Sequence, residues 1–324
     1  MTGTPLRVAF AGLAHSHPYS DAANVRALGA EVVGVHDADA GAAEEFALRF
    51  GGAAVASVDL LTALRPDLVI ATPRPHDVRG FLHLLGSRDA PVFVNKVIAP
   101  TGARFAEIDR VLTASSAPVG TSSVLRFAPA LVALAGQIGG EDVLALRVHA
   151  QHDNAAFQLP DRAWQDDPRR GGGTAVTVGV HAWEMVDVLL PGAALVSGSG
   201  WTRTRPGSTS ASEDAAGIEG LLRVPGAERE VPVQVLVTGT PGADAYGAEA
   251  VTAAGIRSVS LDVDGDQDAV GDQGEGPNET LGFRDLIHAL LDAAPRGATV
   301  APWGESRVVV ANTVRAAEIA RSDA

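Results

Sequence analysis

Short apolar runs alternate with helix-like segments through the first third of the chain, and this alternation most strongly limits the folds open to it. The runs predict strands at 6–11, 31–36, 68–71, 91–95 and 118–121, and the segments between them predict helices near 18–28, 40–50, 76–87 and 102–115. Strands separated by helices join in parallel, and the helices cover the faces of the resulting sheet. Residues 1–122 are therefore predicted to form a doubly wound α/β domain.

After residue 122 the repeat of apolar residues changes to the period of two that is typical of half-buried strands. This alternation predicts strands at 144–151, 194–203, 215–224, 229–238, 247–254 and 257–263, with helices near 174–190, 279–293 and 303–321. A sheet with one buried face is commonly antiparallel. We predict an α+β domain over residues 123–324, with a large, mostly antiparallel sheet. Such a sheet is broad enough to pack against a second subunit in a homodimer or homotetramer.

Composition and charge exclude several classes of partner. The chain carries 25 Lys and Arg against 39 Asp and Glu, a formal net charge of −14, whereas phosphate-backbone binding needs a concentrated basic surface. It has no cysteine, which excludes disulfides, thiolate metal sites and cysteine nucleophiles. The first residues read as a strand rather than an export signal, and the most apolar stretch, 174–196, contains charged residues. We expect a cytoplasmic protein that binds neither nucleic acid nor membranes.

Lysine usage singles out one residue. Among 25 basic residues, Lys96 is the only lysine. An arginine guanidinium stays charged, whereas a lysine amine can be tuned by burial to transfer a proton or to polarise an oxygen. Lys96 is the first candidate functional residue, and a lysine retained by chance on the surface is the alternative.

A turn that suits a dinucleotide follows the first predicted strand. Gly12, Leu13, Ala14, His15 and His17 lead from that strand into a helix, whose N-terminus is a ready site for phosphate. Gly12 is the only glycine of the usual three, since Ala14 and His17 stand at the other two positions. Asp37 ends the second strand 25 residues after Gly12, where a carboxylate accepts hydrogen bonds from an adenosine ribose and favours NAD over NADP. A turn or helix cap is the alternative role of Asp37.

Two features resemble metal sites without completing one. His15 and His17 have no third ligand nearby in the sequence, so phosphate or nicotinamide contact suits them better. The acidic segment 262–279 resembles a calcium loop, but Gln267 stands where the loop needs glycine and no bidentate glutamate follows at the required spacing. We expect no metal.

The predicted helix at 174–190 separates an apolar stripe from a polar face. Its apolar residues recur at helical spacing, and Thr177, His181 and Glu184 follow on another face. An imidazole titrates near neutral pH and suits general-base catalysis, whereas a histidine on an apolar helix is also commonly structural. From residue types alone, Arg126 equally suits a surface ion pair, and Trp164 a core aromatic position.

Five motifs in order resemble the Gfo/Idh/MocA family of oxidoreductases, and they cover nearly the whole chain. They are Gly12 with Asp37, the run 71–76, the run 94–97, the run 126–129, and a stretch from Trp164 to His181 containing Asp-Pro, three glycines and Gly-x-His. The resemblance implies an N-terminal Rossmann domain, a substrate-binding and oligomerisation domain after it, and NAD(P)-dependent hydride transfer to or from a CH–OH group of a sugar, polyol or related hydroxy compound.

The resemblance also implies roles for individual residues. It makes Lys96 and His181 catalytic, with His181 taking the hydroxyl proton and Lys96 hydrogen-bonding the reacting oxygen. It adds Thr72, Pro73, His76, Asn95 and Lys96 to the cofactor contacts. For substrate binding it implies Lys96, Arg126, Trp164, Thr177 and His181.

Two departures from the family's motifs leave other functions open. Asn95-Lys96-Val97 stands for the usual Glu-Lys-Pro, and Thr177 stands for the aspartate four residues before the histidine. A threonine supplies no charge, although its hydroxyl suits a hydrogen bond to His181 or to substrate. The alternatives are a non-catalytic cofactor or sugar sensor on the same scaffold, and an NAD-assisted glycoside-processing enzyme.

Overall fold

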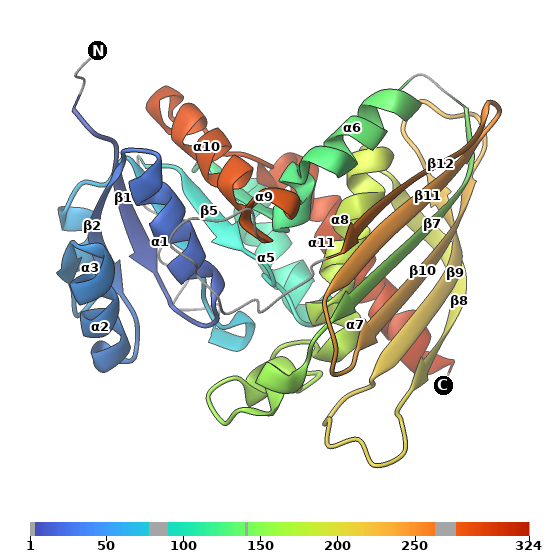
Figure 1. Cartoon of the computed structure of the whole chain (residues 1–324), viewed down its shortest axis with the longest axis horizontal. Helices are drawn as coiled ribbons and strands as arrows, with labels where there is room; N and C mark the ends of the chain where they lie inside the picture. Colours follow the sequence, from blue (N-terminus) through green and yellow to red (C-terminus); the bar gives the residue numbers. More distant parts are fainter. Residues whose placement is uncertain (1–3, 78–89, 140–141, 263–276, 324) are drawn as a thin grey trace. The chain divides into compact units, whose positions relative to one another are not determined.

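A six-stranded parallel sheet forms the centre of the N-terminal unit in the computed structural model (Figure 1). The model describes residues 4–77, 90–139, 142–262 and 277–323. The sheet has the order β3-β2-β1-β4-β5-β6. Its strands are β1 (Arg7–Ala11), β2 (Glu31–His36), β3 (Ala53–Ala54), β4 (Leu68–Ala71), β5 (Val92–Asn95) and β6 (Val119–Ser122). This order and direction confirm the predicted doubly wound, Rossmann-type domain.

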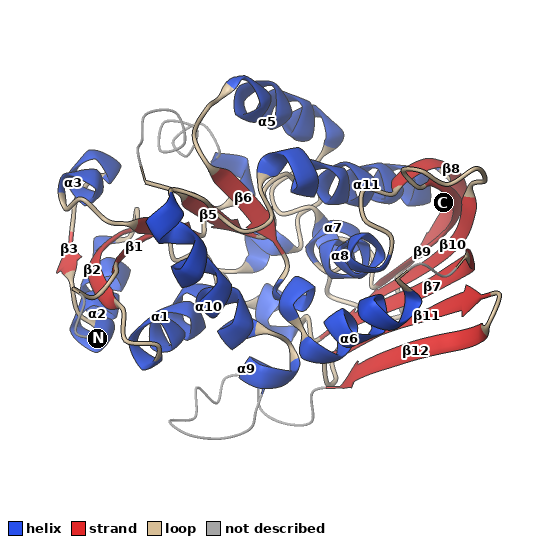
Figure 2. Ribbon diagram, turned by 90° about the horizontal axis from the view of Figure 1, so that it is seen from above, coloured by secondary structure: helices blue, strands red, loops and turns tan. Residues whose placement is uncertain are grey.

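Helices cover both faces of this sheet. They are α1 (His17–Ala27), α2 (Ala40–Phe50), α3 (Val58–Ala63), the part of α5 (Gly102–Ala114) from Glu107 on, and α10 (Phe283–Ala293), with short 3₁₀ turns η1 (Pro75–Asp77) and η5 (Ala294–Arg296). Figure 2 shows α1, α2 and α10 on one face and α3 on the other. Most of the helix predicted at 76–87 lies outside the described residues, and its first two residues belong to η1.

Local chemistry explains why α2 has the bounds that the sequence predicted. The Asp39 side chain accepts hydrogen bonds from the amides of Gly41 and Ala42, which satisfies the first turn of the helix. Gly51 ends the helix with a φ of +92°, a conformation that costs glycine little. The Phe46 ring then packs on Phe10 of β1, with ring centroids 5.1 Å apart.

A second six-stranded sheet forms the centre of the C-terminal unit, in the order β12-β11-β7-β10-β9-β8. Its strands are β7 (Val143–His152), β8 (Ala194–Arg203), β9 (Ala215–Arg223), β10 (Val231–Gly239), β11 (Ala245–Thr252) and β12 (Gly255–Asp262). Only β7 and β10 pair in parallel, and every other neighbouring pair is antiparallel. The predicted large, mostly antiparallel sheet is confirmed.

One face of this second sheet is covered by helices. The unit contains α6 (Pro129–Ile138), α7 (Gly173–Thr177), α8 (Gly179–Leu189), α9 (Pro277–Thr280), α11 (Trp303–Ser322) from Arg307 on, and 3₁₀ turns η2 (Val124–Phe127), η3 (Ala155–Gln158) and η4 (Ala163–Gln165). The helices α7 and α8 lie on β7, β9 and β10. Along β10 buried and exposed residues alternate, so the side chains of the opposite face point away from these helices.

The helix predicted at 174–190 is present, but it is interrupted once where one continuous helix was expected. The structure has α7 and α8 with Val178 between them. The Thr177 hydroxyl donates to the carbonyl oxygens of Gln165 and Gly171, and Gly179 follows at the start of α8. A β-branched run followed by glycine is a weak helix former, which favours the break at this point. The helix α6 was not predicted, although Pro129 at its start and its Ala- and Leu-rich sequence suit a helix.

The chain divides into two compact units, and each unit combines separate segments of the sequence instead of lying on one side of a single boundary. One unit comprises residues 1–98, 107–122 and 283–306, and the other comprises 99–106, 123–282 and 307–324. The helix α10 and the start of α11 thus belong with the N-terminal sheet. Within the described part of the chain, no helix is long and apolar enough to cross a membrane.

Candidate active site

The turn after β1 holds the glycine that the sequence selected for dinucleotide binding. Gly12 has a φ of +89°, and a Cβ at this position would lie 2.5 Å from the Thr72 carbonyl oxygen. Its amide donates to the carbonyl of His36 at 2.7 Å. Because β1 lies between β2 and β4, the turn stands where the order of strands reverses. Only glycine fits here, at the place where sheets of this type bind dinucleotides.

Asp37 fixes the conformation of the same turn. One carboxylate oxygen accepts a hydrogen bond from the Leu13 amide at 2.6 Å, and the other accepts one from the Asp39 amide at 2.8 Å. A carboxylate oxygen has two lone-pair positions, so these bonds leave acceptor capacity for a ribose hydroxyl. The structure therefore places Asp37 against the Gly12 turn, a contact between residues 24 positions apart in sequence.

His15 and His17 lie against each other within this turn. The His17 amide donates to Nδ1 of His15 at 3.3 Å, which leaves the proton of the His15 ring on Nε2. Nε2 lies 3.1 Å from the carbonyl oxygen of Lys96, so His15 donates to the backbone of the sole lysine. The His17 ring packs edge-on against His15 and against Phe283. His15 thus connects the turn after β1 with the segment after β5.

The ends of β4 and β5 bring three further predicted residues together. Thr72 follows β4 and is buried, and its hydroxyl accepts a hydrogen bond from Asn95 Nδ2 at 3.0 Å. The Thr72 carbonyl accepts from the Ala14 amide at 3.3 Å. Pro73 follows Thr72, and the partly exposed His76 lies in η1. Asn95 is 2% exposed and Lys96 is 7% exposed, so both lie beneath the surface at the end of β5.

In the C-terminal unit, His181 lies on α8 with 2% of its surface exposed. Its Nδ1 lies 2.6 Å from the hydroxyl oxygen of Ser123. That hydroxyl oxygen also accepts from the Leu125 amide at 3.2 Å, which fixes Ser123 at the start of η2. Ser123 could not be identified from the sequence, because 58 positions separate it from His181 and no local pattern links the two residues.

Aromatic rings surround His181. The His152 ring stacks beside it with centroids 6.1 Å apart, and the Tyr246 ring lies at 5.4 Å. Asp244 accepts from the Tyr246 hydroxyl at 3.0 Å and lies 3.3 Å from Nε2 of His152. Burial, with the neighbouring Asp244 charge, raises the pKa of Tyr246 well above its usual range. This histidine–aspartate pair could not be identified from the sequence either, since His152 ends β7 and Asp244 precedes β11.

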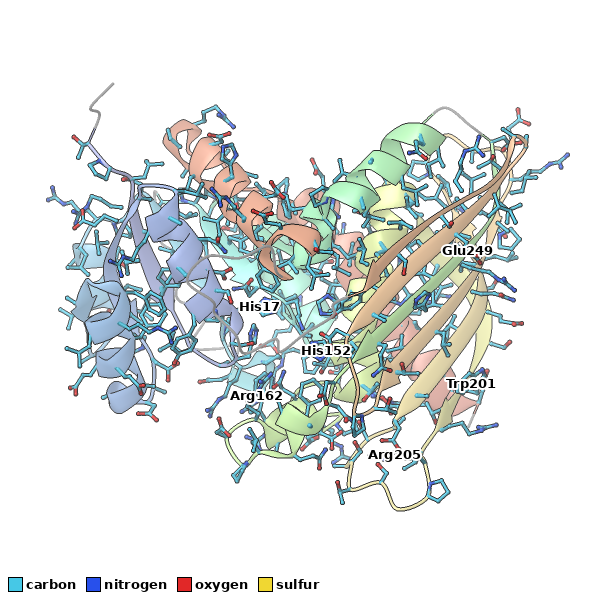
Figure 3. All side chains as sticks on the ribbon, in the orientation of Figure 1. His17, His152, Arg162, Trp201, Arg205 and Glu249 are labelled. Atoms are coloured by element: carbon cyan, nitrogen blue, oxygen red, sulfur yellow. The ribbon has the colours of Figure 1, made fainter. Side chains whose placement is uncertain are left out.

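The segment that includes η3 and η4 continues from His152. The Phe157 ring stacks on His152 at 6.0 Å, and the Arg162 guanidinium lies over Phe157 at 5.8 Å. Figure 3 labels His152 and Arg162. Trp164 is 6% exposed, as expected for a core aromatic residue, the alternative to a role in substrate binding. The structure directs the Thr177 hydroxyl to backbone carbonyls and pairs His181 with Ser123 instead.

Arg126 lies between two carboxylates of α8. Its guanidinium forms ion pairs with Glu184 and Asp187, both almost fully buried. Glu184 also accepts a hydrogen bond from the Ser123 amide at 2.9 Å, so the cluster anchors the residue that holds His181. Burial raises the pKa of Glu184 to about 7, and the Arg126 charge opposes that rise. Glu184 therefore faces Ser123 and Arg126.

Replacing Arg126 by methionine should lower the free energy of unfolding by about 3–5 kcal/mol, because two buried carboxylates lose their cation. The loss should grow as pH rises. Without the cation the folded-state pKa of Glu184 rises further above its unfolded value, so stability is lost as the carboxyl ionises. Chemical denaturation at several pH values measures both effects. Arg223→Met, in an exposed pair with Glu230, should cost less than about 1 kcal/mol; equal losses would contradict this account.

The described residues contain no group of three or more histidine, aspartate or glutamate side chains suited to a metal ion. The acidic segment 262–279 lies for the most part outside those residues.

The structure of this chain is similar to those of several known proteins. No family model matches the chain, and no curated protein matches it by sequence. GenD2 from gentamicin A biosynthesis, solved in complex with NAD, is 17% identical with a TM-score of 0.76, covering 100% of this chain and 95% of its own. A myo-inositol dehydrogenase from Corynebacterium glutamicum is 14% identical with a TM-score of 0.78, covering 98% and 97%.

A third similar structure is that of an enzyme solved with both a cofactor and a polyol. Myo-inositol dehydrogenase from Lactobacillus casei, in complex with NAD(H) and myo-inositol, is 18% identical with a TM-score of 0.73, covering 99% of this chain and 94% of its own. At these identities the similarity, with TM-scores of 0.73 to 0.78, shows the fold alone. Over its full length the chain has the fold of GenD2 and of the inositol dehydrogenases, as the resemblance of its motifs implied.

Proposed function

We propose that this protein is an NAD-dependent oxidoreductase that transfers a hydride between nicotinamide and the CH–OH carbon of a sugar, polyol or related hydroxy compound. The observation that carries the proposal is the Gly12 turn at the strand-order reversal, held by Asp37 and adjoining the segment of the sole lysine. Proteins of the same fold support it, since one was solved with NAD and another with NAD(H) and myo-inositol.

The residues of the N-terminal unit fit a nicotinamide dinucleotide. A Cβ at Gly12 would collide with the Thr72 carbonyl, so glycine permits the close approach of the turns after β1 and β4. The buried Asn95 Oδ1 has no hydrogen-bond donor among the described atoms. The residues that would hold the group are Gly12, Leu13, Ala14, His15, His17, Asp37, Thr72, Pro73, His76, Asn95 and Lys96. When bound, the nicotinamide supplies the hydride-accepting carbon.

The protein's own residues manage the proton and the developing charge. His181 accepts the hydroxyl proton at Nε2, because Nδ1 is directed at Ser123. Lys96 donates a hydrogen bond to the same substrate oxygen and stabilises the negative charge that forms on it. The neutral Ser123 hydroxyl thus orients the His181 ring, since Thr177 supplies no carboxylate for that purpose.

Three residues complete the proposed substrate side. Trp164 lies within η4, and Thr177 donates a hydrogen bond to the backbone carbonyl of nearby Gly171. Arg126 acts through the cluster with Glu184, which holds the Ser123 amide. Removal of Arg126 therefore affects the substrate side through Ser123.

Replacing Ser123 by alanine should lower kcat about tenfold, the worth of one buried hydrogen bond of roughly 1.4 kcal/mol. The pH dependence of kcat should shift as well, because the His181 tautomer with a basic Nε2 is no longer favoured. Ser123→Thr, which keeps the hydroxyl, should retain most activity. A pH profile of the alanine variant that matches the wild type would show that Ser123 does not position the base.

Cofactor choice is tested by titrating the protein with NAD and NADP. The wild type should bind NAD more tightly, because the Asp37 carboxylate repels the additional phosphate of NADP. In Asp37→Asn the ratio of the two dissociation constants should fall about tenfold, the equivalent of about 1.4 kcal/mol of charge repulsion. The ratio is the readout, since the amide also weakens the bonds to Leu13 and Asp39 that shape the turn. An unchanged ratio would remove Asp37 from the cofactor site.

The proposal includes a homodimer or homotetramer formed through the second sheet. The face opposite its helices carries exposed apolar side chains, among them Leu236 and Ile256 at 44% and 63% exposure. Trp201 and Glu249, labelled in Figure 3, lie on strands of the same sheet. Clustered apolar residues on a broad sheet are typical of subunit interfaces. Light scattering of the purified protein gives the number of subunits.

A further inference from the structure

A buried carboxyl group lies on α1, the helix that follows the Gly12 turn in the N-terminal unit. Asp21 on α1 is 0% exposed, and its Oδ2 accepts a hydrogen bond from Asn95 Nδ2 at 2.8 Å. The second hydrogen of that amide is directed at the Thr72 hydroxyl. Asn95 immediately precedes Lys96. Asp21 is therefore one hydrogen bond and one peptide unit away from the sole lysine.

The same pair contains two buried acceptors without donors. Asp21 Oδ1 and Asn95 Oδ1 have no hydrogen-bond partner among the described atoms. A carboxylate only accepts, so an ionised Asp21 leaves both oxygens unsatisfied at a substantial cost in free energy. A protonated Asp21 has an O–H donor and removes part of that deficit. Burial raises the pKa of Asp21 to about 7, while the Asn95 hydrogen bond lowers it.

Burial and the Asn95 hydrogen bond are the two causes of the shift in the Asp21 pKa, and no charged residue in the described part of the chain contributes to it. The helix α1 contacts α2, α10 and β2, and Asn95 ends β5. Titratable or charged residues on these elements and at their ends are His17, Tyr19, Arg26, Glu31, His36, Asp37, Asp39, Glu44, Glu45, Arg49, Lys96, Arg284, Asp285, His288 and Asp292.

We propose that Asp21 is a positioning residue for Lys96, acting as a neutral acid that orients the Asn95 amide at the end of β5. His15, in the turn after Gly12, donates a hydrogen bond to the Lys96 carbonyl. The segment after β5 is thus held by His15 and, through Asn95, by Asp21. Loss of the Asp21 proton gives Asn95 an anionic neighbour and alters the surroundings of Lys96. The consequence for turnover rests on the proposed function.

The single lysine makes a direct test possible. Protein produced with lysine carrying ¹³C at Cε should give one resonance from this chain, that of Lys96. Its chemical shift is followed from about pH 5 to about pH 11.5, a range that spans the pKa of Asp21 and the ordinary lysine pKa of about 10.4. The wild type should show two inflections, one near pH 7 from Asp21 and one from the amine itself.

Asp21→Asn is the decisive variant, because its amide has the shape and the hydrogen-bonding pattern of the protonated acid. It should keep the low-pH position of the Lys96 resonance and lose the inflection near pH 7. Asp67→Asn removes an exposed carboxylate of the same unit and should leave both inflections. Identical curves for the wild type and Asp21→Asn would overturn the proposal, and so would loss of the inflection in Asp67→Asn.

Thermal unfolding gives a second readout. Asp21 binds a proton more tightly when folded than when unfolded, so wild-type stability should fall between about pH 4 and pH 7, and Asp21→Asn should lack that contribution. A rise in the melting temperature of wild type relative to Asp21→Asn over this range would contradict the proposal. Both measurements use protein without substrate, so absence of turnover would sink the proposed function and leave this result standing.

Discussion

Replacing His181 by alanine should lower kcat by about 10²- to 10⁴-fold, the usual contribution of a general base. The wild type should lose activity as pH falls, because protonation of His181 removes the lone pair that accepts the hydroxyl proton. The variant should lack that acid limb. Initial rates measured across the pH range with saturating NAD give both quantities.

Burial makes a fold control necessary for this variant. His181 is 2% exposed and packs against the rings of His152 and Tyr246, so alanine also leaves a cavity. His181→Gln fills more of that space without supplying a base of useful pKa and should lose activity to a similar extent. His288→Ala removes an exposed histidine and should leave the profile unchanged. Retention of the acid limb in both His181 variants would assign the base to another group.

Replacing Lys96 by methionine should lower kcat by about 10²- to 10³-fold, as expected for removal of one donor to a developing oxyanion. Methionine preserves most of the length of a side chain that is 7% exposed, so folding should survive. Lys96→Arg keeps the charge, yet a planar guanidinium does not reproduce the position of an ammonium group. It should also lose most activity.

Binding separates the two contributions of Lys96. If the amine acts on the substrate oxygen, the dissociation constant for NAD should change much less than kcat. The control is Arg104→Met, which removes a cation from α5. Wild-type turnover in Lys96→Arg would show that charge alone suffices, and wild-type turnover in Lys96→Met would remove Lys96 from the mechanism.

Local sequence signals predicted the parts of the fold that depend on local chemistry. Asp39 and Gly51 determine the ends of α2, and the predicted range 40–50 agrees with the structure. The alternating apolar residues likewise predicted β8 at its observed bounds, 194–203. Capping, glycine punctuation and apolar periodicity operate within a few residues, so they are readable from one sequence.

Contacts across long sequence separations could not be predicted in this way. Ser123 and His181 lie 58 positions apart, and Asp21 and Asn95 lie 74 apart. Neither pair has a periodic pattern that links its members. Thr177 illustrates the limit, since its position before His181 indicated a partner for the ring, and its hydroxyl instead binds two backbone carbonyls next to the helix break. The residue types indicated the chemistry, and only the fold shows which side chains meet.

The most direct test of the account is to mix the protein with saturating NAD and each of a panel of sugars, polyols and glycosides, and to follow NADH absorbance and the melting temperature together. Ligands that bind the folded state raise its stability by mass action. The account predicts that NAD raises the melting temperature and that at least one sugar or polyol raises it further and yields NADH. A further rise with no NADH from any compound would contradict net oxidation of a substrate, and would identify either a sensor or a glycoside-processing enzyme that returns the hydride within each cycle.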